Sequence, residues 1–205
     1  MTPQQQKTKI MKRTGLLVML GIVAILGFWG CNGYNGLVTA DQDVKKAWSN
    51  VETNYQRRTD LYSSIIKTVE ASANFEKSTL QSVVEARAKA TSINVDINDP
   101  ASLEAYQKAQ ANLQGSFSKL IASFEAYPDL KTTAAFRDFQ TQIEGTENRI
   151  NVARQDYNKS IEGYNLQVKR FPKSILASIF GYKEKPFYKA DEGSEKNPDI
   201  KFDIK

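Results

Sequence analysis

The stretch VKKAWSNVETNYQRRTDLYSSIIKTV, residues 44–69, decides the fold. Eight of its residues, which we call the seam positions, recur at alternating intervals of four and three residues: Val44, Trp48, Val51, Tyr55, Arg58, Tyr62, Ile65 and Val69. These intervals place side chains on one face of an α-helix, and such a face packs against neighbouring helices. The stretch therefore predicts a long helix with one face buried against other helices.

Proline and glycine, which interrupt helices, are rare around this stretch. No proline occurs between Pro3 and Pro100, and no glycine occurs between Gly36 and Gly115. Long helices are the expected result. The apolar rhythm changes phase after residues 72–74, a weak helix breaker, so we place a turn there.

Two further segments carry the same rhythm. Asn98-Asp99-Pro100 stops one helix and starts another, because an acid caps a helix and proline fits its first position. Apolar rows then occupy residues 103–127 and 136–171, and each ends at a proline. Helices with one apolar stripe each bury those stripes against one another. The sequence predicts an all-α fold, an antiparallel up-and-down bundle of four long helices, or three if the turn at 72–74 does not form.

The segment before this bundle, TGLLVMLGIVAILGFWG at residues 14–30, is apolar or small throughout, and no charged residue follows until Asp41. As a helix it spans about 25 Å, and its continuation to Val38 spans about 37 Å, enough to cross a bilayer core with some tilt. The cations that precede it are Lys7, Lys9, Lys12 and Arg13. The positive-inside rule then predicts a single-pass protein with one membrane-spanning helix at 14–38, a cytoplasmic N-terminus and the helical body outside the cytoplasm.

Cys31 offers an alternative to a retained membrane helix. If translation starts at Met11, MKRT is a charged n-region, residues 15–29 are an apolar h-region, and Gly30-Cys31 is a lipoprotein cleavage point with lipid on Cys31. Bulky Phe28 and Trp29 fit that cleavage point poorly, so we favour the retained helix over lipidation of Cys31. Both readings tether the body to a membrane.

Composition excludes several functional classes. The chain has 28 Lys and Arg against 23 Asp and Glu, and four of those cations precede the apolar segment, so the body is nearly neutral and no nucleic-acid partner is expected. The sequence has no histidine, which removes Ser-His and Cys-His pairs and the commonest zinc ligand. A single cysteine forms no intrachain disulfide and no thiolate cluster. We expect no enzyme, no metal site and no cofactor.

Polar residues beside the buried face form the candidate site. Arg58 falls on a core-facing position, and a buried arginine needs a carboxylate, which Glu147 or Glu144 would supply. The residues of this possible interaction site or interhelical polar cluster are Arg57, Arg58, Asp60, Glu147, Asn148 and Tyr157. We favour a cluster that fixes the register between helices, and a ligand pocket is the alternative.

The chain divides into four regions. They are a basic flank at 1–13, the membrane segment at 14–38, the bundle at 39–172, and a short apolar run followed by an extended polar tail at 173–205. The apolar run, residues 174–180, is closed by Gly181 and is expected to dock on the bundle. From Lys183 on, charged residues alternate with scattered apolar ones without a period.

Short motifs in a fixed order resemble the LemA family of bacterial membrane proteins. They are Tyr34-Asn35-x-Leu37-Val38, Ala47-Trp48-Ser49-x-Val51-Glu52, Tyr55-Gln56-Arg57-Arg58-x-Asp60-Leu61, Val84-x-Ala86-Arg87, Tyr127-Pro128-x-Leu130-Lys131, Thr146-Glu147-Asn148-x-Ile150, Ala153-Arg154-x-x-Tyr157-Asn158, Tyr164-Asn165 and Phe171-Pro172. The sequence departs from the family at Tyr62-Ser63-Ser64, where Ile-Pro-Asn is usual.

The resemblance implies a single-pass membrane protein with an up-and-down helical domain and no established catalytic activity. We therefore expect a membrane-anchored, non-enzymatic scaffold or adaptor of the bacterial envelope, with a small-ligand or lipid-binding helical module as the alternative. The expected partners are the membrane and other envelope proteins, a membrane protease among them. Glycines spaced by three add the expectation of a homo-oligomer: Gly27, Gly30, Gly33 and Gly36.

Overall fold

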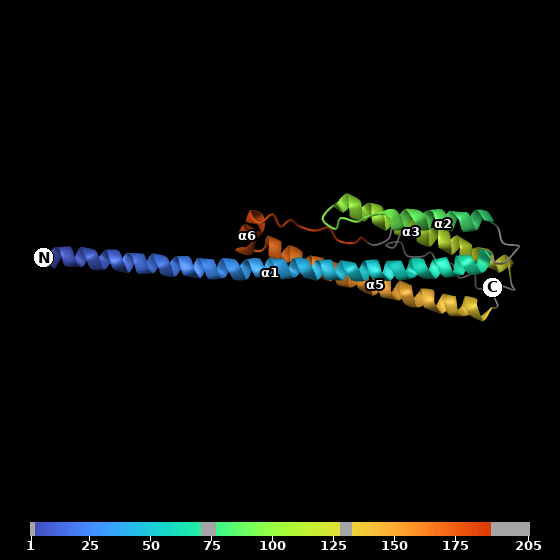
Figure 1. The fold of residues 1–205 in the computed structure, drawn as a ribbon, viewed down its shortest axis with the longest axis horizontal. Helices are drawn as coiled ribbons and strands as arrows, with labels where there is room; N and C mark the ends of the chain where they lie inside the picture. The colour runs from blue at the N-terminus through green and yellow to red at the C-terminus, as the bar shows by residue number, and fades with distance from the viewer. Residues whose placement is uncertain (1–2, 71–76, 128–132, 190–205) are drawn as a thin grey trace, which may run out of the picture. The chain divides into compact units, whose positions relative to one another are not determined.

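The computed structural model of the 205-residue chain describes residues 3–70, 77–127 and 133–189, with side chains from residue 15 onward (Figure 1). Over these three ranges the chain is helical and contains no β-strand, which confirms the predicted all-α class. The predicted turn at 72–74 lies outside the described residues, between the end of one helix and the start of the next.

The helices follow one another with short connections. In chain order they are α1 (Pro3–Glu70), α2 (Lys77–Ser92), α3 (Pro100–Ser123), the 3-10 turn η1 (Phe124–Ala126), α5 (Ala134–Lys169) and α6 (Lys173–Ile179). The four long helices expected for the bundle are thus present, and α1 contains the apolar segment as well as the stretch 44–69. Helix α3 begins at the predicted restart, Pro100, and α5 ends shortly before the predicted stop at Pro172, whereas Pro128 lies outside the described residues.

The start of α3 shows why the chain breaks where it does. Asp99 adopts an extended backbone, and its carboxylate accepts a hydrogen bond from the Ala101 amide at 3.0 Å. Pro100 occupies the first helical position, where its missing N–H costs nothing. The predicted stop and restart is therefore a capped helix N-terminus.

The chain forms two compact units, each described by itself. The first unit comprises Met1–Val44 and Glu162–Glu184, and the second comprises Lys45–Ile161 and Lys185–Lys205. Both α1 and α5 contribute to each unit.

The second unit has a hydrophobic core to which α1, α2, α3 and α5 all contribute. At its centre the Phe117 ring stacks on the Tyr62 ring with centroids 3.6 Å apart, and Phe139 lies 5.6 Å from Phe117. Around them, Val69, Val83 and Leu120 are fully or almost fully buried. Within this unit, α2, α3 and the parts of α1 and α5 that belong to it run in alternating directions (Figure 1).

The stretch 44–69 is buried as its spacing predicts. All eight seam positions have at most 5 % of their surface exposed, including the charged Arg58 at 2 %. In the first unit, the apolar side chains from Leu16 to Phe28 are instead exposed. By length and composition, this part of α1 is able to cross a membrane.

We expect alkali to unfold the second unit between pH 10 and 12. Burial raises the pKa of Tyr62 and Tyr157 to about 12, whereas tyrosines of an unfolded chain lose their protons near pH 10. Above pH 10 the unfolded state therefore binds fewer protons than the folded state, so stability is complete below that pH and falls as pH rises toward 12. Circular dichroism at 222 nm, with tyrosinate absorbance, checks this; Tyr62→Phe should weaken the pH dependence.

Candidate functional site

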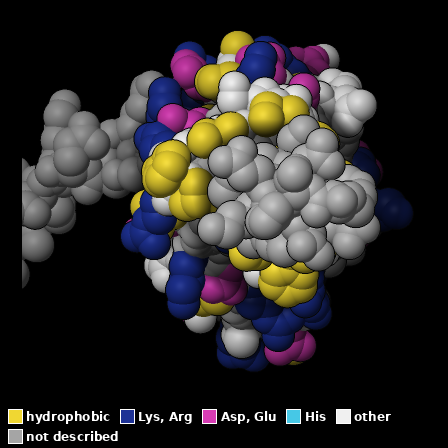
Figure 2. All heavy atoms as spheres, turned by 90° about the vertical axis from the view of Figure 1, so that its left-hand side faces the viewer, with side chains coloured by type: hydrophobic (Ala, Val, Ile, Leu, Met, Phe, Trp, Pro, Cys, Tyr) yellow, Lys and Arg dark blue, Asp and Glu magenta, His cyan; other side chains and the backbone are white. Residues whose placement is uncertain are grey.

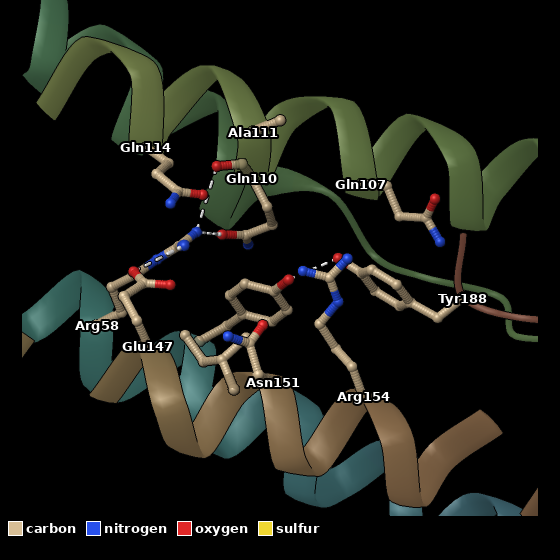
Figure 3. Close-up of a pocket in the computed structure, with 11 residues that line it drawn as sticks. Arg58, Gln107, Gln110, Ala111, Gln114, Glu147, Asn151, Arg154 and Tyr188 are labelled. Atoms are coloured by element: carbon tan, nitrogen blue, oxygen red, sulfur yellow. Dashed lines mark hydrogen bonds and ion pairs between the residues drawn. The ribbon is translucent and has the colours of Figure 1, made fainter. Parts of the chain in front are cut away.

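Arg58 joins three helices of the second unit through one guanidinium group. Its Nη1 donates to the Glu147 carboxylate of α5 at 3.2 Å. Its Nη2 donates to Gln110 of α3, to the side-chain oxygen at 2.8 Å and to the backbone carbonyl at 3.3 Å. Figure 3 shows these three side chains pointing toward one another. Of the two carboxylates that the sequence suggested, Glu144 and Glu147, it is thus Glu147 that pairs with Arg58.

The guanidinium of Arg58 is buried and lies beside two aromatic rings. The guanidinium carbon lies 4.8 Å from the centre of the Tyr55 ring and 5.7 Å from that of Tyr62. Arg58 is 2 % exposed, whereas the Glu147 side chain is 27 % exposed. The Nε of Arg58 has no hydrogen-bond partner among the described residues. A buried charge of this kind depends on its carboxylate partner for stability.

A pocket of about 170 Å³ opens beside this cluster (Figure 3). Its lining includes two guanidinium groups, from Arg58 and Arg154, but one carboxylate, from Glu147. The remaining lining residues are Tyr55, Gln107, Gln110, Ala111, Gln114, Ile150, Asn151 and Tyr188. The lining therefore carries one net positive charge and several amide groups, a composition suited to a small polar or anionic molecule.

One wall of this pocket comes from an extended segment after the bundle, residues 185–189, which we call the C-terminal strap. The Asn158 side-chain amide pairs with the backbone of Tyr188 twice: it accepts from the Tyr188 N–H at 2.8 Å and donates to its carbonyl at 2.9 Å. The Tyr188 hydroxyl shares a hydrogen bond with Tyr55, and Arg154 lies over the Tyr188 ring at 4.3 Å. The strap is thus held by its backbone, by the Tyr188 side chain and by the buried Lys185, whose Nζ donates to the Asn98 side chain.

The other predicted site residues lie apart from the Arg58–Glu147 pair. Arg57, Asp60 and Asn148 are exposed, and Asp60 accepts a hydrogen bond from Gln56 on its own helix. Tyr157 is fully buried, with its ring 5.2 Å from that of Trp48. Cys31 is exposed on α1.

Sequence reasoning did not assign Gln110, Arg154 or Tyr188 to the site. Gln110 gave the clearest signal, because it is a polar residue within an apolar row and is 5 % exposed. A second pocket of about 270 Å³ borders the first and shares Gln114 and Glu147 with it. Its lining is more apolar and includes Phe117, Phe139 and Ile143.

We expect Tyr157→Phe to stabilise the protein, by up to about 1 kcal/mol. The Tyr157 hydroxyl is buried and has no hydrogen-bond partner among the described residues, so removing it eliminates a desolvation cost without breaking a bond. Urea unfolding followed by circular dichroism measures the change. Tyr164→Phe is the matched control, because the Tyr164 hydroxyl donates to the Lys183 carbonyl at 2.9 Å and its loss should destabilise.

The groups assembled here are better suited to binding than to catalysis. The carboxylate of Glu147 is occupied by Arg58, and general acid–base chemistry needs a group that is available to exchange a proton. Within the described ranges, no three His, Cys, Asp or Glu side chains are close enough together to hold a metal ion. Guanidinium, amide and phenol groups instead offer hydrogen bonds to a polar partner.

Similarity to known proteins agrees with the resemblance seen in the motifs. The model of one protein family, described as the LemA family, matches residues 47–202. Magnetosome protein MamQ 2 of Paramagnetospirillum magneticum is 24 % identical over 193 residues, which cover 84 % of this chain and 71 % of that protein. Protein LemA of Metamycoplasma hominis is 23 % identical over 177 residues, covering 86 % and 78 %.

Proposed function

Because this chain belongs to the LemA family, we propose that it is a membrane-anchored, non-enzymatic helical scaffold or adaptor of the bacterial envelope. One observation carries the proposal: a single helix, α1, contains both the exposed apolar run and eight buried seam positions of the body. An anchor and a folded module on one helix suit a protein that presents a surface at a membrane. Two of its relatives are named as a magnetosome protein and as LemA, and neither is the name of an enzyme.

The same proposal includes a topology. The four cations before residue 14 favour a cytoplasmic N-terminus, a single span within residues 14–38, and a bundle outside the cytoplasm. Protease accessibility of the bundle in intact spheroplasts, with the mass of the N-terminal peptide, tests this arrangement. Digestion from outside and an unmodified Cys31 are expected. A lipid mass on Cys31 would instead establish the lipoprotein form.

The surface offered to a partner is formed by exposed polar residues of α1 and α5. Arg57 and Asp60 on α1 and Asn148 on α5 are exposed, so they are available to another protein. A membrane protease or a second copy of this chain is the class of partner that we propose. The Arg58–Glu147 pair joins the same two helices and fixes their register.

Affinity capture from bacterial membranes in mild detergent tests the scaffold function. The wild-type chain and Lys119→Glu, a charge reversal at an exposed position on α3, should retain the same partner, identified by mass spectrometry. Arg57→Glu, a reversal of equal size, should lose it. Recovery of every variant as a monomer alone would contradict a scaffold.

The pocket beside Arg58 favours a second candidate function, a small-ligand or lipid-binding helical module. Its volume of about 170 Å³ suits a molecule of a few heavy atoms, and its net positive charge suits a carboxylate. Thermal unfolding with succinate as the probe tests this candidate, since a ligand that binds only the folded state raises the midpoint. The shift should disappear in Arg154→Gln and persist in Arg149→Gln, which alters an exposed arginine outside the lining. An equal shift in all variants would exclude this pocket.

A further inference from the structure

Helix α6 in the first unit is apolar on two opposite sides. On one side Ala177 is 1 % exposed, and Leu176 approaches Gly33 of α1 so closely that a Cβ on Gly33 would lie 2.6 Å from the Leu176 Cδ1. On the other side, apolar side chains at intervals of four form one exposed ridge, which Phe180 extends. Their exposed fractions are 81 % for Phe171, 50 % for Ile175, 69 % for Ile179 and 55 % for Phe180. Exposed apolar side chains that gather in one ridge mark an interaction surface.

The end of α6 is folded in a defined way. Gly181 has a φ of 75°, the left-handed conformation that glycine adopts without strain, and the Tyr182 N–H donates to the Ala177 carbonyl at 2.9 Å. This turn places the Phe180 ring 4.7 Å from the Tyr34 ring of α1, and the Tyr182 ring 6.4 Å from it. The exposed ridge therefore belongs to an ordered element packed on α1, and its exposure is a fixed property of the surface.

The charge around α6 is mostly positive, although Lys169 forms an ion pair with Glu184 at 2.8 Å. Between Lys169 and Lys183 the sequence contains four cations and no acidic residue: Lys169, Arg170, Lys173 and Lys183. Figure 2, viewed from the N-terminal side, shows hydrophobic side chains with Lys and Arg side chains next to them. Anionic lipids attract cations near a bilayer surface, so apolar and basic groups together match an anionic membrane interface.

The position of α6 along α1 matches the edge of a bilayer. At 1.5 Å per residue, the helix from Gly15 to Gly33 is about 27 Å long, close to the thickness of the hydrocarbon core. Burial by protein begins at the same level, since Phe28 is 78 % exposed but Gly33 is buried. Trp29 and Tyr34 also lie there, and both are residue types that concentrate at membrane interfaces.

We propose that α6, with Phe171 and Phe180, lies in the lipid–water interface as a second membrane contact, bound to anionic phospholipid. Its ridge of Phe171, Ile175 and Ile179 enters the acyl boundary while the surrounding cations meet the headgroups. This contact rests on the membrane anchoring proposed above, because α1 delivers α6 to the interface. We therefore expect two elements to hold the first unit at the membrane: α1 across the membrane and α6 along its surface.

Site-specific fluorescence in vesicles tests this contact with the full chain. In a Cys31→Ser background, Ile179→Cys carries an environment-sensitive fluorophore, and Val152→Cys, 50 % exposed on α5 of the second unit, is the matched control. The proteins are reconstituted in phosphatidylcholine vesicles with and without phosphatidylglycerol. We expect blue-shifted emission at position 179, several-fold stronger quenching by a doxyl-labelled lipid than at position 152, and an increase with phosphatidylglycerol. Circular dichroism verifies that both variants remain helical.

The outcomes separate this contact from the anchoring. Chains that fail to float with vesicles would overturn both. Chains that float, but whose fluorophore at position 179 is quenched by aqueous iodide as readily as the control, would overturn the contact alone. Shielding of position 179 in native bacterial membranes but not in pure lipid vesicles would also overturn it, because the ridge would then be covered by a protein.

Discussion

Replacing Phe117 with alanine is expected to lower the free energy of unfolding by about 3–5 kcal/mol, the largest effect of any single change proposed. Phe117 is 3 % exposed, and its ring stacks on Tyr62 of α1 and contacts Phe139 of α5. Its removal therefore opens a cavity where three helices meet, and their backbones prevent the neighbours from filling it completely. Urea unfolding of the purified chain in mild detergent, followed at 222 nm, measures the loss.

Phe187→Ala is the matched control, because it deletes the same atoms from a ring that is 48 % exposed. We expect a loss of about 1 kcal/mol or less there. Equal losses for the two variants would contradict the view that the aromatic centre at Phe117 dominates the stability of the second unit.

Replacing Glu147 with leucine is expected to cost about 2–3 kcal/mol. Breaking a fully buried ion pair costs about 3–5 kcal/mol because one charge remains without its partner. Glu147 is 27 % exposed, so water screens part of the interaction and the expected cost is lower. Arg58 would keep only its bonds to Gln110, within surroundings that are otherwise aromatic. The same unfolding measurement applies.

A double-mutant cycle distinguishes a lost ion pair from a lost side chain. Arg58→Met together with Glu147→Leu should recover most of the stability, since two apolar residues then replace two charges. Glu104→Leu is the control at an exposed pair: its carboxylate lies 2.8 Å from Lys108, and its loss should cost less than about 1 kcal/mol. Strictly additive losses in the cycle would show that the Arg58–Glu147 contact contributes nothing of its own.

Residue spacing alone predicted the helices and their buried faces. The buried side of a helix repeats with the helical period of about 3.6 residues. The spacing of apolar residues from Val44 to Val69 therefore predicts the buried face without any knowledge of the partner helices. The need for a carboxylate near Arg58 was also predictable, because a buried charge requires one. The structure places Glu147 there, as one of the two residues that this argument selected.

The pocket was not predictable in the same way. The hydroxyl groups of Tyr55 and Tyr188 share a hydrogen bond although the residues are 133 positions apart, and no periodic pattern in the sequence connects them. The strap is extended and irregular, so its contacts with Asn158 and Arg154 depend on the shape of a bundle that is already formed. The exposed ridge of α6 was not predicted, for a related reason. The apolar run 174–180 suggested docking on the bundle, but a sequence does not show which side of a short helix is covered.

The C-terminal strap has a consequence for biosynthesis. Chains are made from the N-terminus at about 5–20 residues per second, so the 20 residues from Arg170 to Lys189 are added over about 1–4 s after α5 is complete. Helical bundles fold in about microseconds to milliseconds. The nascent bundle therefore has time to assemble before Tyr188 arrives. During this interval the pocket beside Arg58 lacks one wall, and closure by the strap is the last step in the maturation of the site.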